Sequence, residues 1–143
     1  MALSVADDGT QNGYGQRSIS LTVGSGDILY AFGAVKSGVL TSVEWNSTAL
    51  TQLYSYTAVG GNADYDAYAY ISTNPEAGTY NLVTQGQSSN PTLLIGVVIT
   101  GGPDTENYET YWNSDIYQIT HTYSGTMSSG GIVICTICEQ RPS

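Results

Sequence analysis

Hydrophobic and polar residues alternate along several short segments of the chain, which is the pattern of β-strands with one buried face. The alternation is clearest in residues 18–23, where isoleucine, leucine and valine point to one side and serine and threonine to the other. Residues 27–35 are apolar on both faces and follow the turn residues 24–26. This second pattern indicates a strand in the middle of a sheet, because only such a strand is covered on both sides.

Further segments of the same kind follow at the intervals of a β-sandwich. The segments at 40–45 and 49–56 flank turn residues and predict a hairpin. Other strands are expected at residues 64–71, 79–83, 92–100, 116–122 and 131–138. The sequence therefore predicts an all-β fold, a two-sheet antiparallel β-sandwich of about eight strands with Ig-like or jelly-roll topology.

The length of 143 residues suits one domain. We assign residues 1–16 to an N-terminal arm, 17–140 to the sandwich and 141–143 to a C-terminal tail. Residues 104–115 are acidic and rich in tyrosine without a sustained period, which indicates a surface excursion. No apolar run reaches the roughly 20 residues of a membrane span, and the first residues lack the features of an export signal. Synthesis in the cytoplasm is the expectation.

The charge balance excludes two classes of partner. Twelve Asp and Glu against three Lys and Arg give a net charge of −9, although only 10% of the residues are charged. Such a chain repels phosphate, so we expect it to bind neither nucleic acid nor a membrane. The same scarcity of charge allows contacts with other proteins to be built from neutral groups.

Candidates for chemistry are few. His121 is the one histidine and has no nucleophile motif beside it, so we expect no catalytic residue and no enzymatic activity. Cys135 and Cys138 lie three residues apart in a predicted strand, face opposite sides and cannot pair with each other. Asp64 and Asp66 share a strand face and are weak candidates for calcium, but we expect no metal and no cofactor.

Aromatic residues are the unusual feature, with 12 Tyr and two Trp against a single Phe. Tyrosine favours interfaces, where one end of the side chain is apolar and the other wet. The excursion 104–115 combines such residues with acids, and we predict that it contacts a partner through Tyr108, Tyr111, Trp112, Glu106 and Glu109. An alternative use of the aromatic rings is stacking on sugars, for which Trp45 and Trp112 are the candidates.

Three motifs occur in an order that resembles a known family. They are residues 26–29, residues 40–51 (LTSVEWNSTALT) and residues 69–80 (AYISTNPEAGTY). Together they resemble a β-sandwich domain family of bacteriophage virion proteins, which includes capsid decoration and tail-associated proteins. The chain departs from that family at Ser47, where the family usually has glycine in the hairpin.

The resemblance implies a non-enzymatic role in the virion. The expected function is that of a capsid decoration or cement protein that stabilises the shell, bound to the major capsid protein or other virion proteins and forming a homo-oligomer. Its location would then be the capsid surface, after synthesis in the host cytoplasm. The alternative is a carbohydrate-binding or host-attachment module of a tail or head fibre.

Overall fold

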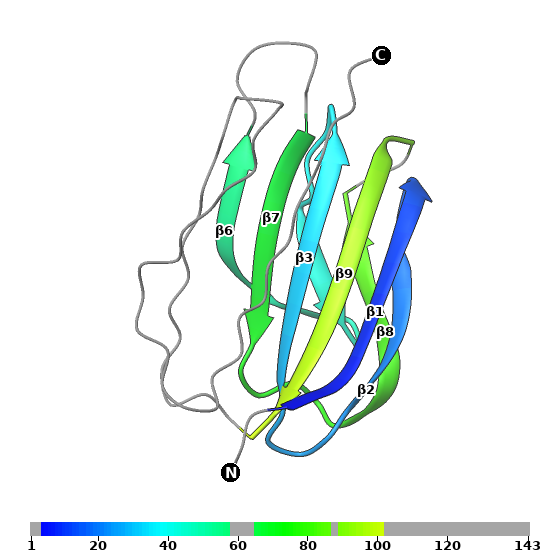
Figure 1. Cartoon of the computed structure of the whole chain (residues 1–143). Helices are drawn as coiled ribbons and strands as arrows, with labels where there is room; N and C mark the ends of the chain where they lie inside the picture. The colour runs from blue at the N-terminus through cyan, green and yellow to red at the C-terminus, as the bar shows by residue number, and fades with distance from the viewer. Residues whose placement is uncertain (1–3, 58–64, 87–88, 102–143) are drawn as a thin grey trace.

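The computed structural model describes residues 4–57, 65–86 and 89–101. In these residues the regular structure is entirely β and forms nine strands in two antiparallel sheets packed face to face (Figure 1). The strands are β1 (Ser4–Tyr14), β2 (Ser18–Val23), β3 (Ile28–Lys36), β4 (Ser42–Trp45), β5 (Thr48–Ala49), β6 (Thr51–Thr57), β7 (Tyr65–Ser72), β8 (Gly78–Gln85) and β9 (Pro91–Thr100). The predicted β-sandwich is confirmed.

The strand order selects one of the two expected topologies. The five-stranded sheet has the order β1-β9-β3-β7-β6, and the four-stranded sheet has the order β2-β8-β4-β5. Thus β1 pairs with β9, β2 with β8, β3 with β7 and β4 with β5, which is the nested pairing of a jelly roll. In an immunoglobulin sandwich β1 and β2 would share a sheet, whereas here they lie in different sheets.

Two strands match their sequence patterns closely. Strand β2 has the predicted bounds, and its apolar side chains are buried while its serines and threonine are exposed. Strand β3 was expected to be central, and it lies between β9 and β7. The remaining expected strands within the described residues start or end within two residues of β7, β8 and β9. The strands expected at 116–122 and 131–138 lie outside the described residues.

The assignment of residues 1–16 to an arm is wrong. Strand β1 pairs with β9 along its whole length and forms one edge of the five-stranded sheet. Two of its side chains also bond the backbone of β2: the Asp7 carboxylate accepts from Thr22 N at 2.6 Å, and Gln11 Oε1 accepts from Ser18 N at 3.0 Å. The segment is therefore an integral strand that joins the two sheets at this edge.

The hairpin predicted around residues 46–48 is confirmed only in part. A two-residue turn of Asn46 and Ser47 joins β4 to β5, with φ of 44° and 62°, as in a type I′ turn. Strand β5 ends after two residues, and the chain then passes to the other sheet as β6, which pairs with β7. The second half of the predicted hairpin therefore belongs to the opposite layer.

Replacing Ser47 by glycine is expected to stabilise the protein. A serine at positive φ is sterically destabilised by roughly 1–2 kcal/mol, which glycine avoids. Glycine also gives the unfolded chain more conformational freedom, and this offsets part of the stabilisation. We expect a net increase of about 0.5–1 kcal/mol in the free energy of unfolding, measured by urea denaturation. Ser20→Gly, in the extended strand β2, is the matched control and should destabilise; a loss of stability in both variants would contradict the argument.

The core lies between the two sheets and depends on small residues in the five-stranded sheet. Leu21 and Leu82 of the four-stranded sheet are almost fully buried against it. Gly96 lies opposite them, and a Cβ atom there would be 2.6 Å from Leu21 Cδ1 and 2.7 Å from Leu82 Cδ2. Gly96 pairs with Gly9 on one side and Ala31 on the other. This row of small residues lets the leucines of the opposite sheet pack directly on the backbone.

Candidate functional site

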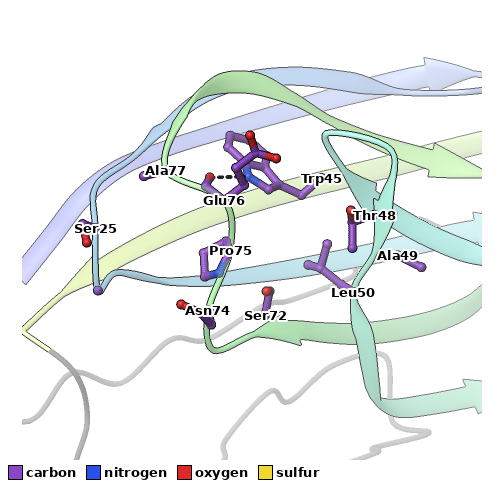
Figure 2. Close-up of a pocket in the computed structure, with 11 residues that line it drawn as sticks. Ser25, Trp45, Thr48, Ala49, Leu50, Ser72, Asn74, Pro75, Glu76 and Ala77 are labelled. Atoms are coloured by element: carbon purple, nitrogen blue, oxygen red, sulfur yellow. Dashed lines mark hydrogen bonds between the residues drawn. The ribbon is translucent and has the colours of Figure 1, made fainter.

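A hollow of about 450 Å³ lies at one end of the sandwich. The turn before β3, the β4–β5 hairpin and the loop between β7 and β8 come together around it (Figure 2). We call it the end hollow, and it is lined by Ser25, Gly26, Trp45, Thr48, Ala49, Leu50, Ser72, Asn74, Pro75, Glu76 and Ala77. Three connections that are distant in sequence thus build one surface.

Glu76 fixes the loop between β7 and β8 over the hairpin. Its carboxylate accepts hydrogen bonds from Tyr80 Oη at 3.0 Å and from Asn46 Nδ2 at 2.8 Å. Its backbone carbonyl accepts a bond from Trp45 Nε1 at 2.9 Å, drawn as a dashed line in Figure 2. The hydrogen bond to the Glu76 carboxylate and its charge raise the pKa of the Tyr80 hydroxyl. The wall of the end hollow is therefore anchored by several bonds.

Trp45 does not provide a sugar-stacking face. Only 2% of its surface is exposed, and its ring meets the Tyr80 ring edge to face, with the centroids 5.5 Å apart. The ring belongs to the core cluster between the sheets. The expectation for Trp45 as an exposed stacking residue is wrong, because the indole is used to join the hairpin to the core.

The polar rim of the end hollow is nevertheless suited to an uncharged ligand. Ser25, Thr48, Ser72 and Asn74 line it, and their side chains make no hydrogen bond to other described residues. Leu50 and Pro75 add apolar surface. Hydroxyl and amide groups beside apolar surface can bind a neutral polyhydroxylated molecule, whereas the Glu76 carboxylate disfavours an anion.

A second candidate surface is the outward side of the four-stranded sheet. We call it the hydroxyl face, and its outward side chains are Ser18, Ser20, Thr22, Ser42, Glu44, Thr79, Asn81, Val83 and Gln85. The Thr22 and Thr79 hydroxyls lie 3.0 Å apart and share a hydrogen bond. Gln85 links neighbouring strands, accepting from Gln16 at 3.0 Å and donating to the Glu44 carboxylate at 2.9 Å. Mostly neutral polar side chains thus cover this face, together with Val83 and the Glu44 carboxylate.

Sequence reasoning noted the serines and threonine of β2 but did not identify this face. The signal was present in the period-two pattern of residues 18–23 and in the polar residues of β8. What the sequence lacked was the pairing of β2 with β8 and of β8 with β4, which places three separate polar rows side by side.

Only one of the two aspartates considered for a cation lies within the described residues. Asp66 lies in β7, and its carboxylate accepts a bond from the Tyr68 hydroxyl at 3.4 Å. Asp64 lies outside the described residues. In the part of the chain that the structure describes, no group of three or more histidine, cysteine, aspartate or glutamate side chains is placed to hold a metal ion.

The candidates in the C-terminal part of the sequence also lie outside the described residues. They include the predicted partner contact and the second stacking residue, together with the histidine and the cysteines: Glu106, Tyr108, Glu109, Tyr111, Trp112, His121, Cys135 and Cys138. Their roles stay predictions.

Two tyrosines of β7 point into the sandwich and not toward a partner. The Tyr68 and Tyr70 rings are stacked, with centroids 6.3 Å apart, and both are buried. The Tyr70 hydroxyl is buried without a hydrogen-bond partner in the described structure. Burial, aided by neighbouring Tyr68, raises the pKa of Tyr70 to about 12. Burial, followed by the charge of Asp66, also raises the pKa of Tyr68.

This arrangement predicts an alkaline transition. Tyr70 has a pKa of about 12 in the folded chain and about 10 when unfolded. Its contribution to stability should thus be complete below pH 10 and lost progressively as the pH rises toward 12. Tyr70→Phe should flatten this decline and leave stability at neutral pH unchanged or higher, because it removes an unpaired buried hydroxyl. Urea denaturation across this pH range is the measurement, and equal slopes for both proteins would contradict it.

Comparison of the chain with protein-family models, with curated proteins and with solved structures finds no match. Within the described residues there is also no helix with the length and apolar character to cross a membrane.

Proposed function

We propose that the protein is a non-enzymatic structural component of a bacteriophage virion, a capsid decoration or cement protein that stabilises the shell. The observation that carries the proposal is the hydroxyl face, together with the resemblance of residues 26–29, 40–51 and 69–80 to a virion domain family. A jelly roll presents such a face on a rigid support, because the strands beneath it are held by the core.

The chemistry of the hydroxyl face suits docking on a shell. Binding through neutral hydroxyl and amide groups avoids the free-energy cost of removing isolated charges from water. The Glu44 carboxylate also lies on this face, where it already accepts a bond from Gln85, and the Ser42 hydroxyl lies 3.4 Å from it. The partner in this proposal is the major capsid protein or another virion protein with a neutral or basic surface.

The net charge bears on how copies assemble. At −9, isolated copies repel one another, so self-association requires close neutral contacts or a lattice that holds the copies in place. A homo-oligomer organised by the capsid satisfies both conditions.

Incorporation into particles tests the proposal. Virions produced with the unmodified chain, Ser20→Glu or Thr10→Glu are purified and imaged by cryo-microscopy. Ser20→Glu puts a charge on the hydroxyl face, whereas Thr10→Glu puts the same charge on exposed β1 in the other sheet. We expect at least a tenfold loss of incorporation for Ser20→Glu alone.

The outcomes separate the parts of the proposal. Absence of the unmodified chain from purified virions would overturn a virion role, and its presence only on a tail or fibre would overturn the capsid position. Normal incorporation of Ser20→Glu would show that the hydroxyl face is not the contact.

The end hollow favours one second candidate, a carbohydrate-binding or host-attachment module. Its rim offers the Ser72 and Asn74 side chains to a neutral sugar next to apolar Leu50 and Pro75. A glycan array with the full chain, Asn74→Ala and Thr10→Ala tests this function. Binding that is lost only in Asn74→Ala would support it, and no binding to any glycan would overturn it.

A further inference from the structure

Strand β1 has no buried side chain of its own, yet it covers apolar residues of β2. Its side chains are all exposed or half-buried, and Val5 and Tyr14 are 50% and 73% exposed. Beneath it, Ile19 and Leu21 of β2 are only 9% and 1% exposed. The strand packs on them at Gly9, where a Cβ atom would be 2.4 Å from Ile19 Cγ2 and 3.5 Å from Leu21 Cδ2. If β1 moved away, these side chains and the edge of β9 would lose their cover.

The groove between β9 and β2 is shaped for the strand that fills it. On one side, β9 pairs with β1 along its whole length. On the other side, the Asp7 carboxylate accepts a hydrogen bond from Thr22 N. Further along β1, Gln11 Oε1 accepts a bond from Ser18 N in the same way. Gly9 lies midway between these two acceptors, where β2 leaves no room for a side chain. The groove therefore selects a strand with two spaced acceptors and a central glycine.

The turn between β1 and β2 is held closed by Arg17. Its guanidinium donates to three backbone carbonyls: Gly15 O at 3.2 Å, Asn12 O at 3.5 Å and Tyr14 O. These carbonyls belong to the end of β1 and to the turn itself, where Gly15 has a φ of 76°. A chain that extended through this turn would lose the bonds to Arg17 but could keep every contact in the groove. The Arg17 bonds thus stabilise the form in which β1 lies on its own chain.

We propose that the groove between β9 and β2 is a binding site for β1 of a second copy, and that neighbouring copies exchange this strand. Because the exchanged strand is identical, it makes the same ladder with β9, the same two bonds to β2 and the same contact at Gly9. The exchanged form differs mainly in the turn and in the entropy lost on association. Copies held side by side lose less of that entropy, and here the inference rests on the homo-oligomer of the proposed function.

Photo-crosslinking between isotopically distinct copies of the purified full chain tests this inference. Thr10 is exposed on β1 and lies opposite Ile95 of β9, and it is replaced by p-benzoylphenylalanine in unlabelled protein. This protein is incubated with an equal amount of heavy-isotope-labelled chain without the probe, irradiated and analysed by mass spectrometry. A crosslink to residues 91–100 of the same copy reports the closed strand, and a crosslink to those residues of a labelled copy reports exchange.

Arg17→Ala is expected to raise the fraction of mixed-label crosslinks at least about tenfold at the same concentration, because only the closed turn loses bonds to a charged donor. Arg17→Lys, which cannot hold several carbonyls with a planar fork of donors, should give a smaller rise. The matched control is Gln16→Ala, which removes a neighbouring side chain and its bond to Gln85 but none of the guanidinium bonds. We expect it to change the fraction by less than about twofold.

Three results would overturn the inference. One is the absence of mixed-label crosslinks in the unmodified turn and in both Arg17 variants at the highest soluble concentration. Another is mixed-label crosslinks that all lie outside residues 91–100, which would mean that copies meet through another surface. The third is an equal rise in Gln16→Ala and Arg17→Ala. Circular dichroism checks that each protein is folded, and Arg17→Lys gives the reading if Arg17→Ala is not. Since purified protein is used, none of these results depends on the proposed virion role.

Discussion

Trp45→Ala is expected to lower the free energy of unfolding by about 3–5 kcal/mol, the range for removing a large buried aromatic side chain. The indole is almost fully buried in the core between the sheets. Its ring packs on Tyr80, and its Nε1 donates to the Glu76 carbonyl at 2.9 Å. Alanine would leave a cavity and an unpaired carbonyl, so two costs add.

Two further variants separate these costs. Trp45→Phe keeps an aromatic ring but loses the bond to the Glu76 carbonyl, and we expect it to lie between alanine and the unmodified protein. Glu76→Gln keeps that carbonyl and changes only an exposed carboxylate, so the expected loss is about 1 kcal/mol or less. Urea denaturation followed by circular dichroism measures all three. If Trp45→Ala costs no more than Glu76→Gln, the indole does not hold the hairpin to the core.

The strands that could be predicted are those in which the hydrophobicity of each side chain matches its burial. Strand β2 alternates because one face meets the core and the other meets water. Strand β3 is apolar from Ile28 to Val35 because it lies in the centre of the five-stranded sheet, where its side chains on one face are buried in the core and those on the other are buried or partly buried. In both cases the hydrophobic pattern of the strand itself indicates which of its faces are buried, so the local sequence is sufficient to predict the strand.

Strand β1 was not predicted because hydrogen bonds to other strands, and not a row of buried apolar side chains, hold it in place. It lies at an edge, and Asp7, Gly9 and Gln11 occupy inward positions where apolar residues would be expected. The backbone ladder with β9 and the bonds from Asp7 and Gln11 to the backbone of β2 hold it in place. Such bonds depend on the fold as a whole and leave no hydrophobic period in the sequence.

The candidate site shows the same limit. The position of Trp45 beside a turn was readable, but whether its ring points outward or into the core depends on the loop that carries Glu76, 31 residues later. The change of sheet between β5 and β6 was likewise invisible, because both strands carry ordinary strand residues. Contacts between segments far apart in sequence determine both the orientation of the Trp45 ring and the change of sheet after β5.

Ala34→Asp is expected to destabilise the protein by about 3–5 kcal/mol, the cost of an uncompensated buried charge. Ala34 lies on the side of the five-stranded sheet that faces away from the core, is 3% exposed and pairs with Leu93 on one side and Ala67 on the other. Neither of these neighbours offers a side-chain partner for a carboxylate, and the nearest cation on the same face is the partly exposed Lys36, two residues along β3. The new group would have to stay unpaired, take up a proton or draw the Lys36 ammonium over apolar surface, and each of these costs free energy.

The matched control is Ser20→Asp, which places the same charge on the exposed hydroxyl face and should change stability by less than about 0.5 kcal/mol. The contrast should also depend on pH. Burial of the Ala34→Asp carboxyl disfavours its ionised form and so raises its pKa in the folded chain. The loss of stability should therefore be smallest at acidic pH and should grow as the pH rises through about 4, the pKa of aspartate in the unfolded chain. Urea denaturation at several pH values measures both variants. Equal stability of the two proteins would mean that a carboxylate at position 34 reaches water, because only a buried position makes a charge costly.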